Sequence, residues 1–477
     1  MRKLKTVIKI LAAILVIALP FAAVPVTALI LPAQYDASFT SALCQKVDRL
    51  AEIDEPKLVV VGGSSVAFGL DSELIERYTG MPVVNFGVYA ALGTKLMLDL
   101  SRDYINEGDV IVLAPELDRQ TLSMYFNAGT TLQATDGRAD ILFDVPGEHL
   151  FSLLGASWEF AAGKIEYMKS GTAPTTTGAY APENFNDYGD IVYERTENIM
   201  SLYYDPNTEI ELSPDILDPE FLEYLNDYIK YCEKKGASIC FSWCPMNEMA
   251  IAEDTKSEER ITEFESFMQD SIDCTFISSI NDYILEAGYF YDTNFHLNDS
   301  GVARRSITLT RDLLLEIGIP TAVVEKIPEA PELPEIDLRY FGEDENAKYF
   351  EYTALESGAY MITGVKDEYK HLTELTVPLG YNTFKVTHIG ARAFEGCALE
   401  TLRITADTNV RNIMNGTFKG ASSLKALYVL YPDSEAIAPP ADFVGVASGF
   451  TVYVPESWLN CPMYYWGERG LKFEFLN

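Results

Sequence analysis

The sequence predicts an α/β domain with a mostly parallel sheet, preceded by an N-terminal transmembrane helix and followed by a small C-terminal repeat solenoid. Three observations support this: an uncharged apolar segment near the start, short apolar runs alternating with amphipathic stretches from about Pro56 to Pro320, and a pattern recurring every 24 to 27 residues after that. With 477 residues, the chain is long enough for two or three domains. We expect these boundaries: 1–33 for the basic end and membrane segment, 34–319 for the α/β domain, 320–347 for a linker, and 348–477 for the repeats.

The membrane segment follows a basic end. Residues 1–9 carry four basic side chains and no acid, and Ile10 to Leu31 hold no charge over a length that spans a bilayer as a helix. The positive flank places the N-terminus in the cytoplasm and the rest of the chain outside. The alternative is a cleaved signal peptide, with Ile10–Leu19 as its apolar centre and a small-residue site at Val26-Thr27-Ala28. Both interpretations export the bulk of the protein, either anchored in the cell membrane or secreted.

Five short apolar runs are the candidate strands of the parallel sheet. Continuous rather than alternating apolar runs are typical of strands covered by helices on both faces. They are Lys57–Val61, Val83–Phe86, Val110–Leu113, Ala237–Trp243 and Thr275–Ile277. The best-marked helix begins at Asp218, with Pro219 in its first turn, and ends at Gly236.

An insertion at about 120–214 interrupts this α/β rhythm. It is rich in Tyr, Thr, Asn, Gly and Asp, and long connections in compact domains are usually lids or disordered segments. The many aromatic residues favour an ordered cap. They suit contact with sugar rings, but packing of the cap onto the domain explains them equally well.

The segment around IPEAPELPEID has the composition of a stiff, solvated linker. Beyond it, the pattern Leu-x-x-Leu-x-(Val/Ile) recurs, and His388-Ile389 is echoed by Asn412-Ile413. The copies are Leu372/Leu375/Val377, Leu399/Leu402/Ile404 and Leu424/Leu427/Val429, with Phe450/Val452/Val454 as a degenerate fourth. The region resembles the BspA-like leucine-rich repeats of bacterial surface proteins, which implies a display or interaction surface with a possible protein partner.

Charge and cysteine content exclude several classes of function. The chain has 36 Lys and Arg against 71 Asp and Glu, a net charge of −35, which disfavours nucleic acid as a partner. Seven scattered Cys give neither a disulfide scaffold nor a zinc site, and Cys240 and Cys244 fit buried packing positions. We expect no metal and no cofactor.

The most informative stretch for chemistry is VVVGGSSVAFG, residues 59–69. A β-branched run ends in two glycines and two serines, so a strand stops at a tight turn that presents a hydroxyl beside outward-pointing N–H groups. No phosphate-loop motif is present. A Ser-rich turn without chemistry is the alternative for this segment alone.

Two further segments extend this pattern. Gly87 follows the second candidate strand, where the lack of a side chain lets a ligand approach the backbone. Asp292 and His296 lie in the polar loop YDTNFHLNDSG before the last amphipathic run. His149, the other histidine before the linker, lacks an acid at a strand end and is interpreted as structural.

Together these segments resemble the SGNH (GDSL-like) hydrolase superfamily, which implies a flavodoxin-like three-layer α/β/α sandwich and esterase or O-acyltransferase activity. In the family's first block, Ser65 matches the nucleophile and Ser64 replaces the usual acid. Gly87 matches the second block. In the last block His296 matches the base, but Asp292 lies one residue further away than in the family pattern, and Asn294 is a second group that can orient the ring.

The third block departs from the family. Where members carry G-x-N-D, with an Asn in the oxyanion hole, this chain reads Ala114-Pro115-Glu116-Leu117-Asp118. A carboxylate facing a developing oxyanion opposes catalysis. Glu116 therefore binds a substrate hydroxyl in our interpretation, or the missing donor comes from Asn85.

The resemblance implies acyl transfer through Ser65, with His296 as base, Asp292 as its orienting acid, and the N–H groups of Ser65 and Gly87 as the oxyanion hole. The expected function is an exported, membrane-anchored esterase or O-acyltransferase acting on a cell-envelope or extracellular glycan. The alternative is a catalytically inactive surface interaction protein that binds through its repeats.

Overall fold

The computed structural model describes residues 23–476 apart from 25, 201, 356, 433, 461–465 and 467–470. The chain divides into two compact units. Unit 1 comprises Met1–Asn198 and Ile210–Pro331, and unit 2 comprises Ile199–Glu209 and Glu332–Asn477. The division after Pro331 falls inside the predicted linker 320–347. Residues 199–209 belong to unit 2, although they lie within the predicted insertion.

Unit 1 is built on a parallel five-stranded sheet in the order β2-β1-β3-β4-β6. The strands occur where the apolar runs predicted them: β1 (Leu58–Gly62), β2 (Val83–Gly87), β3 (Val110–Leu113), β4 (Ser238–Phe241) and β6 (Thr275–Phe276). Every residue of β1, β2 and β3 is buried, as expected for strands covered on both faces. The strand order is that of flavodoxin-like sheets, whose order reverses between β1 and β3.

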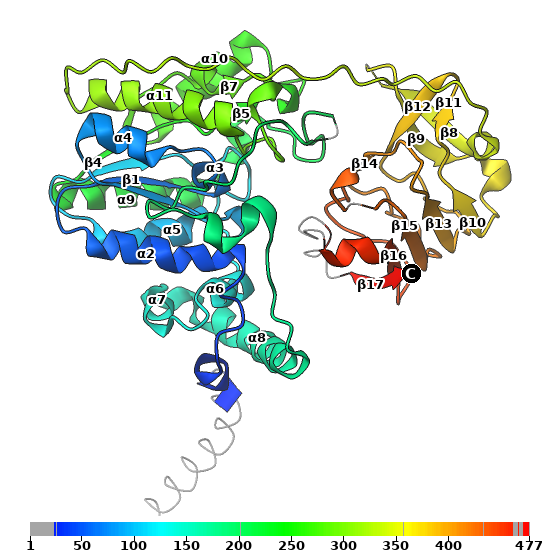
Figure 1. Ribbon diagram of the computed structural model, residues 1–477, viewed down its shortest axis with the longest axis horizontal. Helices are drawn as coiled ribbons and strands as arrows, with labels where there is room; N and C mark the ends of the chain where they lie inside the picture. The colour runs from blue at the N-terminus through cyan, green and yellow to red at the C-terminus, as the bar shows by residue number, and fades with distance from the viewer. Residues whose placement is uncertain are drawn as a thin grey trace, which may run out of the picture. The chain divides into compact units, whose positions relative to one another are not determined.

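Helices cover both faces of this sheet. Figure 1 shows α4 and α11 on one side and α2, α5 and α9 on the other. Their bounds, with those of α3 and α10, are α2 (Ala42–Glu52), α3 (Ser64–Ala67), α4 (Ser72–Thr79), α5 (Thr94–Ser101), α9 (Pro219–Lys235), α10 (Glu258–Ser271) and α11 (Asp299–Glu316). The predicted signals of α9 are confirmed: the Asp218 side chain accepts hydrogen bonds from the N–H groups of Glu220 and Phe221, and Gly236 ends the helix in a left-handed conformation. Two short strands, β5 (Met246–Asn247) and β7 (Ile284–Leu285), pair outside the main sheet.

The insertion holds three helices that the sequence did not predict: α6 (Ala128–Ala134), α7 (Ala139–Asp144) and α8 (Leu150–Ser170). They pack with the start of the described chain rather than with the sheet core, in a cluster formed by Ala28, Tyr35, Leu132, Phe160 and Ala161. The sequence pattern does not predict the 21-residue α8 because apolar residues lie on its exposed side as well as its buried side. Such a helix shows no polar–apolar period.

The predicted transmembrane segment, Ile10–Leu31, falls largely on residues 1–22 and 25, outside the described part of the chain. Residues 26–30, at its end, are helical. Within the described residues, no helix combines the length and apolar character needed to cross a bilayer.

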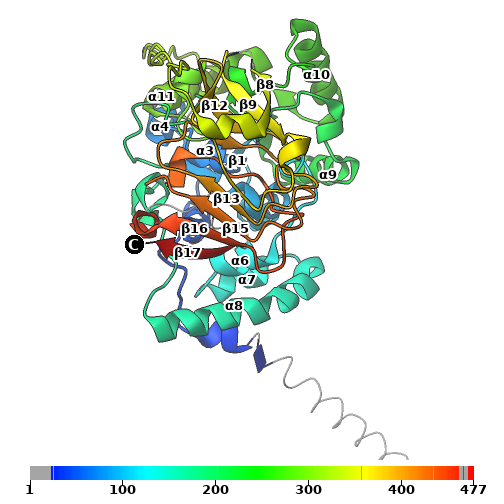
Figure 2. The ribbon, with the colours of Figure 1, turned by 90° about the vertical axis from the view of Figure 1, so that its right-hand side faces the viewer.

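Unit 2 contains a parallel stack of five strands, seen side by side in part in Figure 2. They are β10 (Glu374–Thr376), β13 (Thr401–Ile404), β15 (Ala426–Val429), β16 (Thr451–Pro455) and β17 (Lys472–Leu476). The repeat residues lie in register, with Leu375 opposite Leu402, Leu402 opposite Leu427, Leu427 opposite Val452 and Val452 opposite Phe473. The last rung, on β17, was not predicted.

A second sheet of unit 2 consists of β8 (Phe350–Ala354), β9 (Tyr360–Val365), β11 (Gly380–Tyr381) and β12 (Phe384–Ile389), with β14 (Asn412–Ile413) paired to β12. His388 lies opposite Asn412 and Ile389 opposite Ile413, so the repeated dipeptides are neighbours in parallel strands. The stacked strands of unit 2 bury one apolar core.

Candidate functional site

The candidate site lies at the carboxyl edge of the unit 1 sheet, where ligands of such sheets bind beside the point of order reversal. β1 ends at Gly62 and leads through Gly63 into α3, which contains Ser65. β3 ends at Leu113, three residues before Glu116. These two strands are neighbours in the sheet, so their following turns meet.

Ser65 is fully buried, and its backbone is held from two sides. Its N–H donates to Glu116 Oε1 at 2.6 Å, and its carbonyl oxygen accepts from Arg305 Nη1 at 2.6 Å. Its hydroxyl makes no hydrogen bond of ordinary geometry. That hydroxyl is nevertheless near enough to the Glu116 carboxyl to favour the charged form of that group. The predicted nucleophile thus faces Glu116 in an enclosed turn.

Glu116 Oε1 lies at the Ser65 N–H, which the sequence prediction assigned to an oxyanion hole. The carboxyl lies so close to Gly63 that a Cβ on that residue would approach Oε2 to 2.3 Å, which explains the glycine there. Burial raises the pKa of Glu116, and the Ser65 N–H opposes this rise. From the sequence we expected Glu116 to contact a substrate hydroxyl, but in the structure it contacts the turn of the candidate nucleophile itself.

Gly87 lies directly against this turn. A Cβ at Gly87 would approach the Gly63 carbonyl oxygen to 2.5 Å, so the close approach that the sequence suggested is made by the chain itself. The Gly87 N–H donates to Asn85 Oδ1 at 3.3 Å. Both N–H groups predicted for the oxyanion hole, those of Ser65 and Gly87, therefore already donate to side chains.

Asn85 is fully buried and belongs to a polar network beneath the turn. Its amide nitrogen donates to the Val66 carbonyl at 2.9 Å and to Asp190 Oδ1 at 2.8 Å, and Lys46 Nζ lies 3.2 Å from Asn85 Oδ1. The amide that was expected to replace the missing oxyanion donor is thus committed to the turn. Burial lowers the pKa of Lys46 to about 7 and raises that of Asp190.

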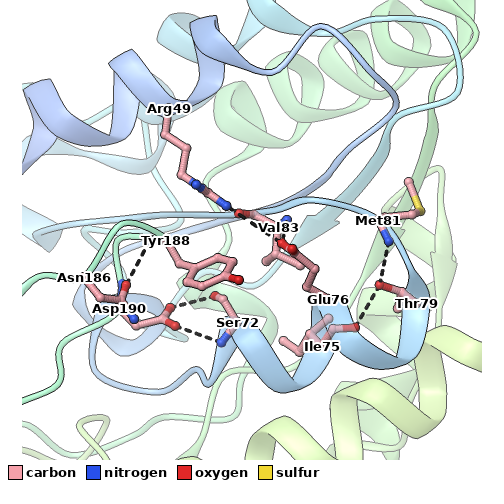
Figure 3. A network of polar contacts seen from close by, with 10 residues as sticks. All are labelled: Arg49, Ser72, Ile75, Glu76, Thr79, Met81, Val83, Asn186, Tyr188 and Asp190. Carbon is pink, nitrogen blue, oxygen red and sulfur yellow. Dashed lines mark hydrogen bonds and ion pairs between the residues drawn. The ribbon is translucent and has the colours of Figure 1, made fainter.

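Figure 3 shows the hydrogen bonds between Asp190 of the insertion and Ser72 of α4. Asp190 accepts from the N–H and the hydroxyl of Ser72, at the start of α4. Asn186 Oδ1 accepts from the N–H of Tyr188, and Arg49 lies over the Tyr188 ring while donating to the Val83 carbonyl. The insertion therefore contacts the candidate site through Asp190.

His296 and Asp292 form a pair in the loop before α11. His296 Nδ1 lies 2.8 Å from Asp292 Oδ1, so the extra residue between acid and base does not prevent their contact. Tyr180, from the insertion, donates to Asp292 Oδ2 at 2.6 Å and lies 3.3 Å from His296 Nδ1. Asn294, the other candidate for orienting the ring, is fully buried, and its backbone carbonyl accepts a hydrogen bond from the Asn247 N–H.

Phe68 connects the histidine pair to the turn of the candidate nucleophile. This ring lies one helical turn after Ser65 and stacks on the His296 imidazole with centroids 4.1 Å apart and planes nearly parallel. The Arg195 guanidinium lies 5.1 Å from the centroid of the same ring, and its Nε and Nη1 are buried without a hydrogen-bond partner. Burial lowers the pKa of Arg195, whereas Asp299 and Asp292 oppose this change.

The structure thus brings Ser65, Gly87 and Glu116 together where the turns after β1, β2 and β3 meet, and it pairs Asp292 with His296, whose ring stacks on Phe68. The Ser65 hydroxyl has no hydrogen-bond partner among the described residues, so it is not hydrogen-bonded to His296. The sequence did not reveal Tyr180, Arg195, Lys46 and Asp190. The first two and the last lie in the insertion, and no motif marks them. Lys46 precedes the first strand, and only its place on the buried face of an amphipathic helix marks it as unusual.

His149, which the sequence analysis interprets as structural, lies close to Asp99 and Glu148. The ligand atoms of these three side chains lie within 4.8 Å of one another, near enough to share a metal ion. The ammonium of Lys95 lies 2.8 Å from Asp99 and 2.6 Å from Glu148, which fills the position a cation would take. The imidazole stacks on Phe126 with centroids 3.7 Å apart. These contacts support the structural role.

No protein-family model and no curated protein matches the chain. A solved structure of a leucine-rich repeat protein from Bacteroides capillosus is similar, with a TM-score of 0.17 and 16% identity, covering 26% of this chain and 94% of that one. The evidence for the stack of unit 2 is therefore the register of its own strands.

Proposed function

We propose that the protein is an exported, membrane-anchored serine esterase or O-acyltransferase of the SGNH type, acting on a cell-envelope or extracellular glycan. The observation that carries the proposal is the Asp292–His296 pair, joined through Phe68 to the Ser65 turn. A strand-end serine, an acid–base pair and a glycine N–H near the order reversal of a parallel sheet are the parts that acyl transfer requires.

In this mechanism the Ser65 oxygen attacks the ester carbonyl while His296 removes the hydroxyl proton and later returns it to the leaving group. Asp292, itself held by Tyr180, fixes the imidazole and stabilises its charged form. Water or a sugar hydroxyl then takes the acyl group from the serine, giving hydrolysis or transfer. No metal or cofactor takes part.

The oxyanion hole opens only when the Glu116 carboxyl leaves the Ser65 N–H. A hydrogen bond of 2.6 Å to a carboxylate is strong, and a negative charge beside the developing oxyanion raises the barrier further. Protonation weakens both effects, and burial of Glu116 shifts its pKa in the direction that favours the neutral form. Glu116 is therefore proposed as the group that sets the rate.

The test uses the full chain in detergent with acetyl and short-chain nitrophenyl esters. Ser65→Ala abolishes hydrolysis, and Glu116→Gln raises the rate, because an uncharged amide replaces the carboxylate and one oxyanion donor is worth about 10²–10³ in rate. The double variant Ser65→Ala/Glu116→Gln is the matched control and stays silent. Equal background rates in all four proteins would overturn the proposal.

The second candidate is an inactive surface protein that binds through the repeats of unit 2. The enclosed Ser65 and the Glu116 carboxyl on its N–H favour this candidate. Covalent labelling by a fluorophosphonate separates the two: a label on Ser65, mapped by mass spectrometry, supports the enzyme. A chain that stays unlabelled even with Glu116→Gln supports the binding protein.

A further inference from the structure

Helix α8 is apolar on two sides. Its inner side carries Phe160 and Ala161, which pack against Ala28, Tyr35 and Leu132. Its outer side carries a row of exposed apolar side chains spaced by three, four or seven residues, so that they share one face of the helix. We call this row the outer stripe; it consists of Phe151, Leu154, Trp158, Ile165 and Met168.

The outer stripe is part of a larger apolar surface. Phe151 is 84% exposed, Phe143 of α7 is 76% exposed, and Ile30 at the end of the N-terminal segment is 75% exposed. A cleft of about 330 Å³ joins these elements and is lined by Leu29, Leu142, Phe143, Leu150 and Leu154, among others. Exposed apolar side chains gathered on neighbouring elements mark binding surfaces more often than singly scattered ones do.

The position of this surface in the chain indicates what covers it. Leu29 lines the same cleft as α8, and it belongs to the uncharged stretch that begins at Ile10. Figures 1 and 2 both show the first described residues beside α8. If the stretch that begins at Ile10 anchors the chain as predicted, Leu29, and with it α8, lies at the bilayer surface.

The chemistry of the stripe fits a lipid interface. Trp158 is nearly half exposed, and tryptophan is enriched where headgroups meet acyl chains. The charged residues of α8 are Glu159, Lys164, Glu166 and Lys169, which cancel in sign. Attraction to anionic lipid is therefore not required, and apolar burial drives the contact.

We propose that the outer stripe of α8 lies in the headgroup region of the bilayer on the exported side, as a second membrane contact beside the N-terminal segment. The inference rests on the anchoring part of the proposed function and is independent of its catalytic part. It gives the insertion a role in placing unit 1 at a fixed height above the membrane.

Trp158 provides the test. The other three tryptophans, Trp243, Trp458 and Trp466, are fully buried. The full chain is reconstituted into phosphatidylcholine vesicles, with or without bromine on the acyl chains, and tryptophan emission is recorded. We expect brominated lipid to quench the wild type and to leave Trp158→Phe unaffected.

A second variant and its control show whether the quenching depends on the stripe. Phe151→Glu places a charge in the stripe and is expected to shift the Trp158 emission to the red and reduce its quenching. Leu315→Glu, on α11, changes an equally exposed apolar residue outside the stripe and leaves the quenching unchanged.

Flotation on a density gradient separates the two ways of failing. If the chain floats with the vesicles but brominated lipid quenches wild type and Trp158→Phe equally, the anchor stands and the inference is wrong. If Phe151→Glu instead converts a dimer to a monomer in sedimentation, a second copy covers the stripe and the inference is also wrong. A chain that does not float contradicts the anchor and the inference together.

Discussion

The two units differ in what they bury. In the described part of unit 2, the buried polar side chains are hydroxyls, an amide and one histidine, and none is a carboxylate, lysine or arginine. Unit 1, by contrast, buries lysine, arginine, aspartate and glutamate side chains: Lys46, Lys57, Lys95, Asp109, Glu116, Lys164, Asp190, Arg195 and Arg305. Burying charge is costly unless it is paired, so a fold retains it where it has a function or a firm partner.

Within unit 1 the buried charges fall into two kinds. Lys57 and Asp109 pair at 3.0 Å at the amino ends of β1 and β3, the edge of the sheet opposite to the candidate site. Glu116, at the carboxyl edge, has no such ion pair, and its Oε2 makes no hydrogen bond. The first kind is held by an ion pair, whereas Glu116, to which the proposed function assigns a chemical role, is not.

The largest effect is expected from breaking the structural pair. Lys57→Met leaves the Asp109 carboxylate buried with only the N–H groups of Lys57 and Asn106 as donors, so unit 1 loses about 3–5 kcal/mol. Hydrogen exchange by mass spectrometry in the intact chain reports each unit separately. The double variant Lys57→Met/Asp109→Asn loses less, and an equal loss in unit 2 would contradict the independence of the two cores.

The matching change in unit 2 is Leu427→Ala, in the middle rung of the stack. It leaves a cavity between Leu402 and Val452 and costs about 2–5 kcal/mol. Because coils contact only their neighbours, increased exchange is expected in β13, β15 and β16 and not in unit 1. Val444→Ala, at an exposed position of unit 2, is the control and changes stability by less than about 0.5 kcal/mol.

A pH change affects unit 2 through its one buried histidine. Burial lowers the pKa of His388 from 6.5 to about 4. Between these values the unfolded chain binds a proton that the folded chain does not, so stability falls as the pH drops, by about 2 kcal/mol at pH 5. Exchange in β12 and β14 at pH 7 and pH 5 measures this loss. His388→Gln, which does not titrate, should remove the difference, and an unchanged pH dependence in that variant would assign it to other groups.

The smallest effect is expected on the surface of unit 2. Arg403 lies over the Tyr428 ring at 4.1 Å and pairs with Glu374, but the pair is solvent-exposed. Arg403→Ala should therefore cost only about 0.5–1 kcal/mol, and less at high salt. A loss of stability as large as that of Leu427→Ala would show that the surface contacts of Arg403, and not the apolar core, hold the strands of the stack together.

The sequence predicted the parts of the fold that repeat or are buried on both faces. The five sheet strands and the rungs at Leu375, Leu402 and Leu427 follow from local patterns. Helix α8 does not, because apolar residues on its exposed side as well as its buried side hide the helical period. The last rung at Phe473 lacks the Leu-x-x-Leu pattern that marked the others.

The sequence identified candidate residues of the site but not the contacts that those residues make. Motif positions placed Ser65, Asp292 and His296, yet they did not reveal that Glu116 holds the Ser65 N–H or that Tyr180 holds Asp292. These contacts join residues 51 and 112 positions apart, and such distances carry no local signal. In the proposed mechanism, the contact between Glu116 and the Ser65 N–H decides whether the oxyanion hole is open.

The three glycines at the strand ends limit how this edge of the sheet can change. A methyl group at Gly62 would collide with the Ala114 carbonyl, one at Gly63 with Glu116, and one at Gly87 with the Gly63 carbonyl. The turns therefore pack directly against one another, so a change in the backbone of one turn displaces its neighbour. New specificity at this edge has to come from side chains that reach in from the insertion and the His296 loop, while the turns stay as they are.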